Sequence, residues 1–397
     1  MKILKNTYHF FIKTIKWTFF VFVTLGIISA IYNLTLPRQS KTIKNLSSSQ
    51  KAYISEAINL QHKLGNELWP GFGDTQIPVI VYNEAFAFLI GYPNPPSGWF
   101  KMPAEEFKGE TWDAVTNDDF YGVPYYRQPL PYPDISPENF TVKVGERWVA
   151  TMQTKEYAAI KFYREFREEL PPVLNAILPY KIFWNIIMGK AENYIVALAH
   201  EMFHAFQGNQ APQRLAESET VAHRASEYPW HQHENAIGWI EETDILLEAY
   251  NSESEEASVQ FINKFVEKRN LRRKMSNLST ATIQYEQKRE WLEGLAKYAE
   301  LKIGLMASEN QLYNHIIEIE EIPDFKDYNT FPAYFKLQIK EVRRAANRPE
   351  ENRYYYTGML QALMLDRLIP TWKTEAFYED VYLENLLEKA VNNYEKN

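Results

Sequence analysis

The feature that most constrains this chain is an uninterrupted apolar segment near its N-terminus. Residues 17–36 read WTFFVFVTLGIISAIYNLTL, twenty residues without a charge. A helix rises about 1.5 Å per residue, so a segment of this length can cross the roughly 30 Å hydrocarbon core of a bilayer. The segment therefore predicts a transmembrane helix, followed by a chain that folds on one side of the membrane.

The charges around this segment predict its orientation. No acidic residue occurs in residues 1–36, and four lysines precede the apolar run: Lys2, Lys5, Lys13 and Lys16. By the positive-inside bias, residues 1–36 form a cytoplasmic tail and signal-anchor, and the remainder is exported. A cleaved signal peptide is the alternative, although the run is long for one and Ile28-Ser29-Ala30 is a poor cleavage site. We expect a single-pass protein of the cell membrane with an extracellular C-terminal domain, secreted if the segment is cleaved.

The overall charge and the cysteine content exclude several classes of function. The formal net charge is −8, and leaving out the four N-terminal lysines makes it −12. An acidic exported domain is repelled by phosphates, so we expect no nucleic-acid partner. The chain contains no cysteine, which excludes disulfides and thiolate metal sites. Any metal must therefore be held by histidines and carboxylates.

After the predicted anchor, the sequence pattern changes twice. Residues 37–66 are predicted to be a polar stalk and a helix that ends near Gly65. Residues 67–155 contain short β-branched and aromatic runs, Pro-rich loops, and a predicted hairpin of residues 140–144 and 147–154. These features indicate a small antiparallel sheet lobe.

The remaining residues, 156–397, have a helical pattern almost to the end. The predicted helices cover residues 155–170, 191–207, 214–227, 234–250, 255–275, 280–305, 353–368 and 375–394. The apolar stretch 178–189 is too short to span a bilayer, so we expect a core or membrane-facing segment there. A sheet followed by many helices predicts the α+β class.

The strongest chemical motif is His200-Glu201-Met202-Phe203-His204. On a helix, His200 and His204 share one face, so both imidazoles can bind one metal ion. Glu201 would lie beside the open coordination position, where it could take a proton from metal-bound water. An isolated buried histidine is usually an ordinary core residue, but two that flank a buried glutamate are costly without compensation. The motif and its uncharged flanks therefore favour one Zn²⁺ ion.

A zinc ion bound by two histidines needs a third protein ligand if it is to keep one open position. The continuation typical of metzincins is absent, because Gln207 and Gln210 stand where that family has Gly and His. Residues 289–301 read REWLEGLAKYAEL and contain Glu293. The pair HEMFH and WLEGLAKYAE resembles the gluzincin clan of zinc metallopeptidases, of the aminopeptidase N type. The resemblance implies a zincin-like helical domain with Glu293 as the third ligand.

The same resemblance implies roles for other positions. Gly294 and Ala296 would be the small residues that let the Glu293 helix approach the HEMFH helix. The segment Tyr354-Tyr355-Tyr356-Thr357-Gly358, followed by MLQALMLDRL, is similar to a Tyr-Tyr-x-Lys-Gly segment of the glycyl aminopeptidase family. By that match, the neutral phenol of Tyr355 would donate a hydrogen bond to the oxyanion. The alternative is that the three tyrosines simply pack.

The sequence also departs from the gluzincin pattern. In aminopeptidase N the third ligand lies closer to the second histidine, and His223 occupies that spacing here. His223 is therefore the alternative ligand, although it could equally be a surface residue. The position four after Glu293, an Asp in the thermolysin pattern, is Lys297. The Gly-x-Met-Glu-Asn segment that grips a substrate's amine in aminopeptidase N does not occur.

Other polar residues receive ordinary interpretations. His231 and His233 do not share a helix face, so we expect them on a loop or rim. Residues 147–154 could offer an edge on which an extended peptide pairs, or could be a covered strand. Five glutamates are expected on a solvated helical face, although one could steady a ligand imidazole. They are Glu217, Glu219, Glu227, Glu241 and Glu242.

Together these features predict a gluzincin-like zinc peptidase that acts on peptide or protein substrates outside the cytoplasm. The predicted metal ligands are His200, His204 and Glu293, and the predicted catalytic residues are Glu201 and Tyr355. One alternative is a zinc hydrolase with a substrate other than a peptide. Another is a catalytically silent extracellular binding protein on a peptidase scaffold, against which the retained Glu201 argues.

Overall fold

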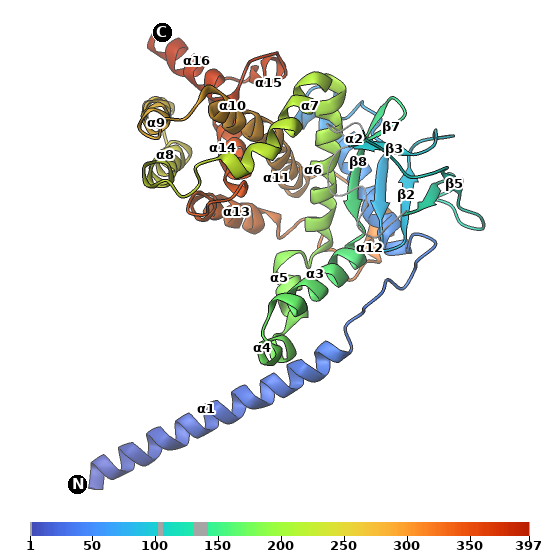
Figure 1. Cartoon of the computed structure of the whole chain (residues 1–397), viewed down its shortest axis with the longest axis vertical. Coiled ribbons are helices and arrows are strands. Elements are labelled where there is room, and N and C mark those ends of the chain that lie inside the picture. Colours follow the sequence, from blue (N-terminus) through green and yellow to red (C-terminus); the bar gives the residue numbers. More distant parts are fainter. Residues whose placement is uncertain (1, 102–105, 131–141, 397) are drawn as a thin grey trace.

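The chain folds into a long N-terminal helix and a body that combines a curled sheet with many helices (Figure 1). The computed structural model describes residues 2–101, 106–130 and 142–396. In Figure 1 the sheet lies at one side of the body and α8 (His233–Asn251) and α9 (Glu255–Met275) lie at the other. Helix α6 (Ala191–Gln210) runs between them. The predicted α+β class is confirmed.

Helix α1 spans Lys2–Leu34 and projects away from the body (Figure 1). Its part Lys13–Leu34 is long and apolar enough to cross a membrane, and 0% of its apolar window is buried by the rest of the protein. Phe19 and Phe22 are 70% and 69% exposed. The predicted apolar helix is confirmed, and by length and composition it could serve as an anchor or as a signal sequence.

The sheet contains the predicted hairpin but is not purely antiparallel. β7 (Val142–Val144) and β8 (Arg147–Gln153) pair across Gly145, whereas residues 140–141 lie outside the described part of the chain. β8 also pairs in parallel with β1 (Val79–Tyr82). The antiparallel prediction is wrong on this point, because alternation along a strand does not reveal the direction of its neighbours.

The described strands form one eight-stranded sheet in the order β4-β3-β7-β8-β1-β2-β6-β5. The other strands are β2 (Phe86–Ile90), β3 (Trp99–Lys101), β4 (Glu106–Lys108), β5 (Asp113–Ala114) and β6 (Tyr126–Pro129). β8 lies inside this order, between β7 and β1. Of the two interpretations of residues 147–154, the structure therefore supports a covered strand.

Helix α2 (Ser48–Leu68) follows the stalk and packs against α6. Ser47 caps the helix by accepting a hydrogen bond from the backbone N–H of Gln50 at 3.1 Å. The predicted end near Gly65 is wrong, since the helix continues for three more residues. A Cβ atom on Gly65 would lie 2.7 Å from the nitrogen of Gly73, so the glycine permits a close approach of the following loop.

One hydrophobic core joins the sheet to the helices. Val79 and Phe88 of the sheet belong to the same buried cluster as Phe203 of α6. Leu295 and Met359, from the C-terminal half of the chain, belong to the same cluster. Helix α6 is therefore buried from both sides, which holds the HEMFH motif rigidly.

Most predicted helices are present, α9 with the predicted bounds and the others with ends shifted by one to three residues. They are α3 (Lys155–Glu169), α6, α8, α9 and α14 (Asn352–Leu368). Two predicted helices are each divided, into α7 (Pro212–Thr220) with the 3-10 turn η1 (Val221–Glu227), and into α15 (Trp372–Glu375) with α16 (Leu383–Lys396). The helices not predicted are α4 (Pro172–Ile177), α5 (Tyr180–Ile187), α12 (Ile317–Glu320) and α13 (Phe331–Ala346).

The predicted helix of residues 280–305 is a continuous helix with a π turn inside it. Its parts are α10 (Thr280–Arg289), the π turn η2 (Glu290–Gly294) and α11 (Leu295–Glu309). A π turn inserts one extra residue into an α-helix and often occurs at functional sites. Here it carries Glu290 and Glu293, which bind different partners.

Behind η2 lies a buried cluster of arginines and glutamates, called here the Arg269 network. Its members are Arg269, Arg272, Arg273, Glu242, Glu286, Glu290 and Glu384. Arg269 donates two hydrogen bonds, of 2.7 and 2.8 Å, to the Glu290 carboxylate. Thr357 of α14 donates a further bond to Glu290 at 2.7 Å. The network therefore ties η2 to α9 and α14.

Glu242 corrects one sequence prediction. It was expected on a solvated helical face, but it is 0% exposed. Its carboxylate accepts hydrogen bonds from Arg269 at 3.1 Å and from Arg272 at 2.7 Å. The helical pattern of α8 alone could not show this burial, because both arginines come from α9.

Candidate metal centre

Three of the predicted metal ligands come together in the structure. His200, His204 and Glu293 are buried, and their ligand atoms all lie within 4.8 Å of one another. The two Nε2 atoms are 3.1 Å apart, and Glu293 Oε2 lies 3.7 Å from His200 Nε2 and 3.4 Å from His204 Nε2. Three donors held tetrahedrally at about 2.0–2.1 Å from a metal are about 3.3–3.4 Å apart. The group could therefore hold a metal ion.

The local sequence explains why α6 presents the two histidines. The residues before the motif are small and apolar, and Ile195, Val196 and Leu198 are 0% exposed. Such a helix can be buried in the core, and its i and i+4 positions then point the same way. His200 and His204 are 8% and 4% exposed, so solvent can still reach the pair to a small extent.

A hydrogen bond to the Nδ1 atom of His204 fixes the tautomer of this residue. The Gln207 amide nitrogen donates to the carbonyls of Trp291 and Leu292 at 3.0 and 3.2 Å. Its oxygen must therefore face His204 Nδ1, 2.8 Å away, and Nδ1 must be the donor. This leaves the Nε2 lone pair of neutral His204 directed at the other two ligand atoms, as metal binding requires.

His200 is held in a similar way by Glu300. Its Nδ1 lies 3.2 Å from Glu300 Oε2, and Lys297 Nζ lies 2.6 Å from Glu300 Oε1. A carboxylate behind a ligand histidine orients the ring and raises its basicity. The sequence analysis assigned neither role: it noted Gln207 only as a departure from the metzincin pattern and Lys297 only as a departure from the thermolysin pattern.

The π turn η2 brings Glu293 to the histidines and meets α14 at a pair of glycines. A Cβ on Gly294 would lie 2.4 Å from Gly358 Cα, and a Cβ on Gly358 would lie 2.5 Å from the carbonyl oxygen of Glu290. Either side chain would collide with the opposite backbone. The expected role of Gly294 is therefore corrected, since it permits contact with α14 and not with the HEMFH helix.

Glu201 lies in this buried region without full hydrogen bonding. It is 9% exposed, and its Oε2 atom has no hydrogen-bond partner among the described residues. Burial raises the pKa of Glu201 to about 8, with His200 opposing and Glu293 and Glu300 adding to the increase. A carboxylate in this state can take up and release a proton near neutral pH.

Tyr355 lies beside the metal group on α14. Its ring stacks on that of His200, with centroids 6.0 Å apart and an interplanar angle of 11°. Burial first, and then the charge of Glu293 and a hydrogen bond to it, raise the pKa of Tyr355 well above its ordinary value. The phenol is therefore a neutral donor at the centre.

Carboxylates outnumber cations around the three ligands. Arg289 pairs with Glu293 at 2.8 Å and lies 3.8 Å from Glu219, and Lys297 pairs with Glu300. With Glu201, four carboxylates face these two cations, and Glu351, also near Arg289, is 32% exposed to solvent. If all four are ionised, the region has a formal deficit of two positive charges. Burial raises the pKa of Glu201 to about 8 and that of Glu219 to about 7, so both carboxyls can take up protons near neutral pH.

The uncompensated charge appears in the pKa of His200. Burial alone would lower this pKa, but Glu293 and Glu300 raise it to about 10. A proton on His200 thus compensates part of the negative charge that a metal cation could neutralise. The formal deficit of two charges matches a divalent ion, which is the fit expected of a metal site.

The other candidate residues lie elsewhere. His223, the alternative third ligand, is exposed on η1 and is not part of the metal group. His231 and His233 are also exposed, at and just before the start of α8. Of the five glutamates named above, Glu219 approaches the centre through Arg289, whereas the glutamate that contacts a ligand imidazole is Glu300.

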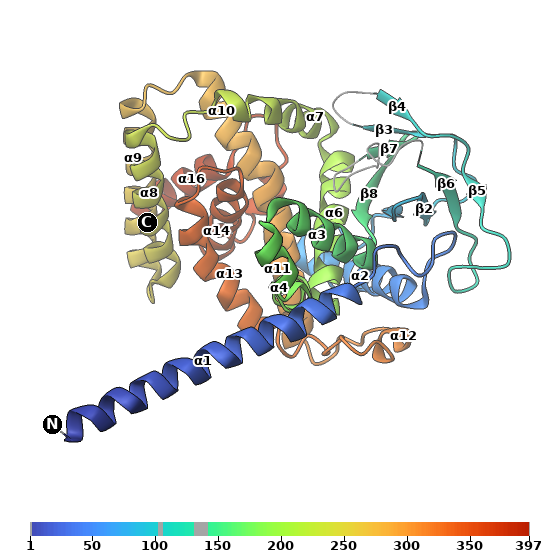
Figure 2. The same cartoon turned by 60° about the horizontal axis from the view of Figure 1, so that its bottom comes forward.

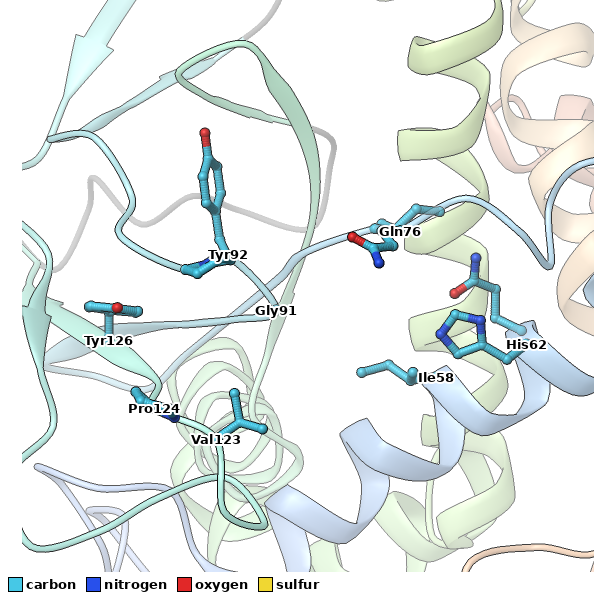
Figure 3. A pocket seen from close by; sticks show the side chains of 11 residues that line it. Ile58, His62, Gln76, Gly91, Tyr92, Val123, Pro124 and Tyr126 are labelled. Atoms are coloured by element: carbon cyan, nitrogen blue, oxygen red, sulfur yellow. The ribbon is translucent and has the colours of Figure 1, made fainter.

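A separate cavity of about 360 Å³ lies between α2 and the loops around β2 and β6 (Figure 3). Tyr92 and Tyr126 line one side, and His62 and Gln76 line the other. The cavity shares no lining residue with the metal group, and His62 Nδ1 is hydrogen-bonded to the carbonyl of Gly73 at 2.9 Å. It is therefore not part of the candidate metal centre.

No protein-family model, curated protein or solved structure matches this chain. The gluzincin resemblance therefore stays a prediction that rests on the motifs.

Proposed function

We propose that this chain is a zinc-dependent peptidase of the gluzincin type that hydrolyses peptide bonds outside the cytoplasm. The observation that carries the proposal is the buried group of His200, His204 and Glu293, with Glu201 and Tyr355 beside it. Two imidazoles and one glutamate are a ligand set typical of catalytic zinc sites, and they leave a fourth position for water or substrate.

The proposed mechanism assigns one task to each residue. When bound, zinc would supply Lewis acidity at the scissile carbonyl and lower the pKa of water. Glu201 accepts the proton of the attacking water and passes it to the leaving amine. Tyr355 donates a hydrogen bond to the carbonyl oxygen as negative charge develops there. Gln207 and Glu300 hold the imidazoles in orientation.

We further propose that α1 anchors the protein in the cell membrane, with its lysine-rich N-terminus in the cytoplasm. The unburied apolar part Lys13–Leu34 supports this location. The mass of the mature N-terminus tests it, because an anchor retains residues 1–36 and a cleaved signal peptide loses them. In the second case the domain would be secreted.

The proposal is tested on the purified full-length protein by metal analysis and by cleavage of a peptide library with and without a chelator. We expect one zinc ion per chain and cleavage that stops on chelation and returns with zinc. The variant Glu201→Gln should keep zinc and lose about 10²- to 10⁴-fold in turnover, whereas Glu309→Gln, an exposed glutamate of α11, should be unchanged.

The possible outcomes separate the alternatives. Retained turnover in Glu201→Gln contradicts the mechanism. Bound zinc with hydrolysis only of substrates other than peptides indicates a non-peptidase zinc hydrolase. Absence of any turnover indicates a silent binding protein on a peptidase scaffold.

A further inference from the structure

We propose that the α4–α5 segment (residues 172–187) inserts into the outer leaflet of the lipid bilayer beside α1. This inference rests on the membrane location of α1 proposed above. It assigns a second membrane contact to the folded body of the protein.

Helix α5 is apolar on its exposed face as well as on its buried face. One face, with Tyr180 and Trp184, is buried against α3 in a cluster of aromatic residues. A helix on the surface of a soluble domain normally turns polar residues outward on its other face. The outward face of α5 instead carries Ile182, Phe183, Ile186 and Ile187, which are 58%, 39%, 73% and 51% exposed.

Helix α4 continues this apolar surface. Val173, Leu174 and Ile177 are 72%, 48% and 40% exposed. The two helices thus place seven large exposed hydrophobic side chains within sixteen residues, a density that the described part of the chain otherwise reaches only in α1. A contiguous exposed apolar patch of this kind indicates a contact with a membrane or a partner.

The patch is continuous with the membrane helix. Asn33 of α1 donates hydrogen bonds to the carbonyls of Ala176 and Leu178 at 3.0 and 2.7 Å. A Cβ on Gly26 would lie 3.5 Å from Ile177 Cγ2, which is ordinary van der Waals contact. Figures 1 and 2 both show α4 alongside the C-terminal end of α1. The two apolar surfaces therefore belong to one face of the molecule.

An apolar groove between α1 and the α4–α5 segment indicates how far the segment reaches into the bilayer. The groove, of about 670 Å³, is lined by α1 from Phe22 to Tyr32 and by α4 and α5 from Ile177 to Asn185. Ten residues of helix rise by about 15 Å, which is the thickness of one leaflet of the hydrocarbon core. Because the N-terminus of α1 faces the cytoplasm in the proposed topology, this leaflet is the outer one.

Several polar groups in and next to the segment are hydrogen-bonded within the protein, as a bilayer favours. The Asn175 side chain donates to the carbonyl of Arg167 at 2.6 Å, and Tyr180 donates to the carbonyl of Asn175 at 2.8 Å. Asn33 donates hydrogen bonds to the carbonyls of Ala176 and Leu178 at the end of α4. Pro171, Pro172 and Pro179 have no backbone N–H that needs a partner. Lys181 lies 5.6 Å from the ring of Tyr32 at the outer end of α1, where a long side chain can reach the headgroups.

The absence of cysteine from the chain makes a direct test possible. Single cysteines are introduced at Ile186 in α5, at Phe19 in α1 and at Leu337 in α13, which are 73%, 70% and 52% exposed. Each full-length variant is labelled with an environment-sensitive fluorophore and reconstituted into phosphatidylcholine nanodiscs that contain acyl-chain-quencher lipids. Circular dichroism before reconstitution checks that each variant is folded.

We expect the label at Ile186→Cys to lose fluorescence to the same extent as the label at Phe19→Cys, while Leu337→Cys is not quenched. If Phe19→Cys is quenched and Ile186→Cys behaves like Leu337→Cys, α1 is in the membrane and the inference about α4–α5 fails. If neither is quenched, the membrane location of α1 fails as well. A blue-shifted but unquenched label at Ile186→Cys indicates coverage by a second copy of the chain, which also overturns the inference.

Discussion

Two buried ionic clusters meet at the π turn η2, and they are built differently. Glu290 belongs to the Arg269 network, and Glu293, three residues later, belongs to the metal group. In the network the carboxylates are bound by arginines, often through two parallel hydrogen bonds. Beside the metal group, Glu201 has a carboxylate oxygen without a hydrogen-bond partner among the described residues.

The difference separates a structural cluster from a binding site. A buried carboxylate that arginine holds through both oxygens has its charge compensated and its geometry fixed. Carboxylates that outnumber their cations leave a negative potential that attracts a metal ion. The first arrangement holds η2 in place, and the second leaves Glu293 able to bind a metal ion. Each prediction below disturbs one of the two clusters and is compared with a matched control variant.

The largest expected effect follows removal of the central arginine of the network. Arg269→Met leaves the carboxylates of Glu242, Glu290 and Glu384 with less compensation in the core, so we expect the free energy of unfolding to fall by about 3–5 kcal/mol. Urea denaturation of the metal-free protein measures it. Arg343→Met, which removes an exposed pair with Asp244, should cost at most about 1 kcal/mol. Equal losses in both variants would contradict the assigned role of the network.

The next effect is the acid sensitivity of the network. Burial raises the pKa of Glu384, but Arg273 and Arg269 outweigh it and lower the pKa from 4.5 to about 2. A lowered carboxyl pKa stabilises the fold above pH 4.5, and this stability is lost as the pH falls through about 2. We expect Glu384→Gln to reduce the pH slope of the unfolding free energy between these values by about 1.4 kcal/mol per pH unit. Glu379→Gln, an exposed control, should keep the original slope.

The metal group should respond to the ion itself. At a free metal concentration 100 times Kd, binding to the folded state adds about 2.7 kcal/mol to the free energy of unfolding. We expect Glu293→Ala to lose most of this increment and its bound metal, while His223→Ala keeps both. Metal analysis and denaturation with and without a chelator measure the two quantities. The reverse pattern would assign the third ligand to His223.

The smallest expected effect concerns the orientation of His200. Glu300→Gln removes the carboxylate charge behind the Nδ1 atom, and we expect metal affinity to fall by about 10- to 100-fold with no change in the fold. Competition with a chromophoric chelator measures the affinity. The matched control is Glu309→Gln, farther along the same helix and exposed. An unchanged affinity in Glu300→Gln would show that Glu300 does not support the ligand.

What could be predicted from the sequence depended on how local each feature is. His200 and His204 follow from helical spacing alone, since residues four apart share a face. Glu293 lies 89 positions beyond His204, so spacing could not connect them and only the motif resemblance pointed to it. Gln207 is three residues after His204 and within reach of the same face, a signal that was available and not used.

Other features could not be predicted from the sequence because they arise from packing between distant elements. The charged pattern of α9 suits a solvated helix, and only the packing of α8, α10 and α16 around it buries Arg269 and Arg272. The pairing of β8 with β1 depends on where the chain returns after the β7–β8 hairpin. Glu300 is the last residue of the motif WLEGLAKYAE, seven residues after Glu293, but the motif alone does not show that its carboxylate contacts His200.

The short connection between α5 and α6 limits how far the metal group can lie from α5. Between Ile187 and His200 the chain has only a brief link and about two and a half turns of helix, which together extend no more than about 28 Å. If α5 rests in lipid as proposed, the metal group lies no farther than this from α5. An extended peptide covers about 28 Å in about eight or nine residues. For the proposed peptidase, this distance would favour substrates that are cut close to the point where they leave the membrane.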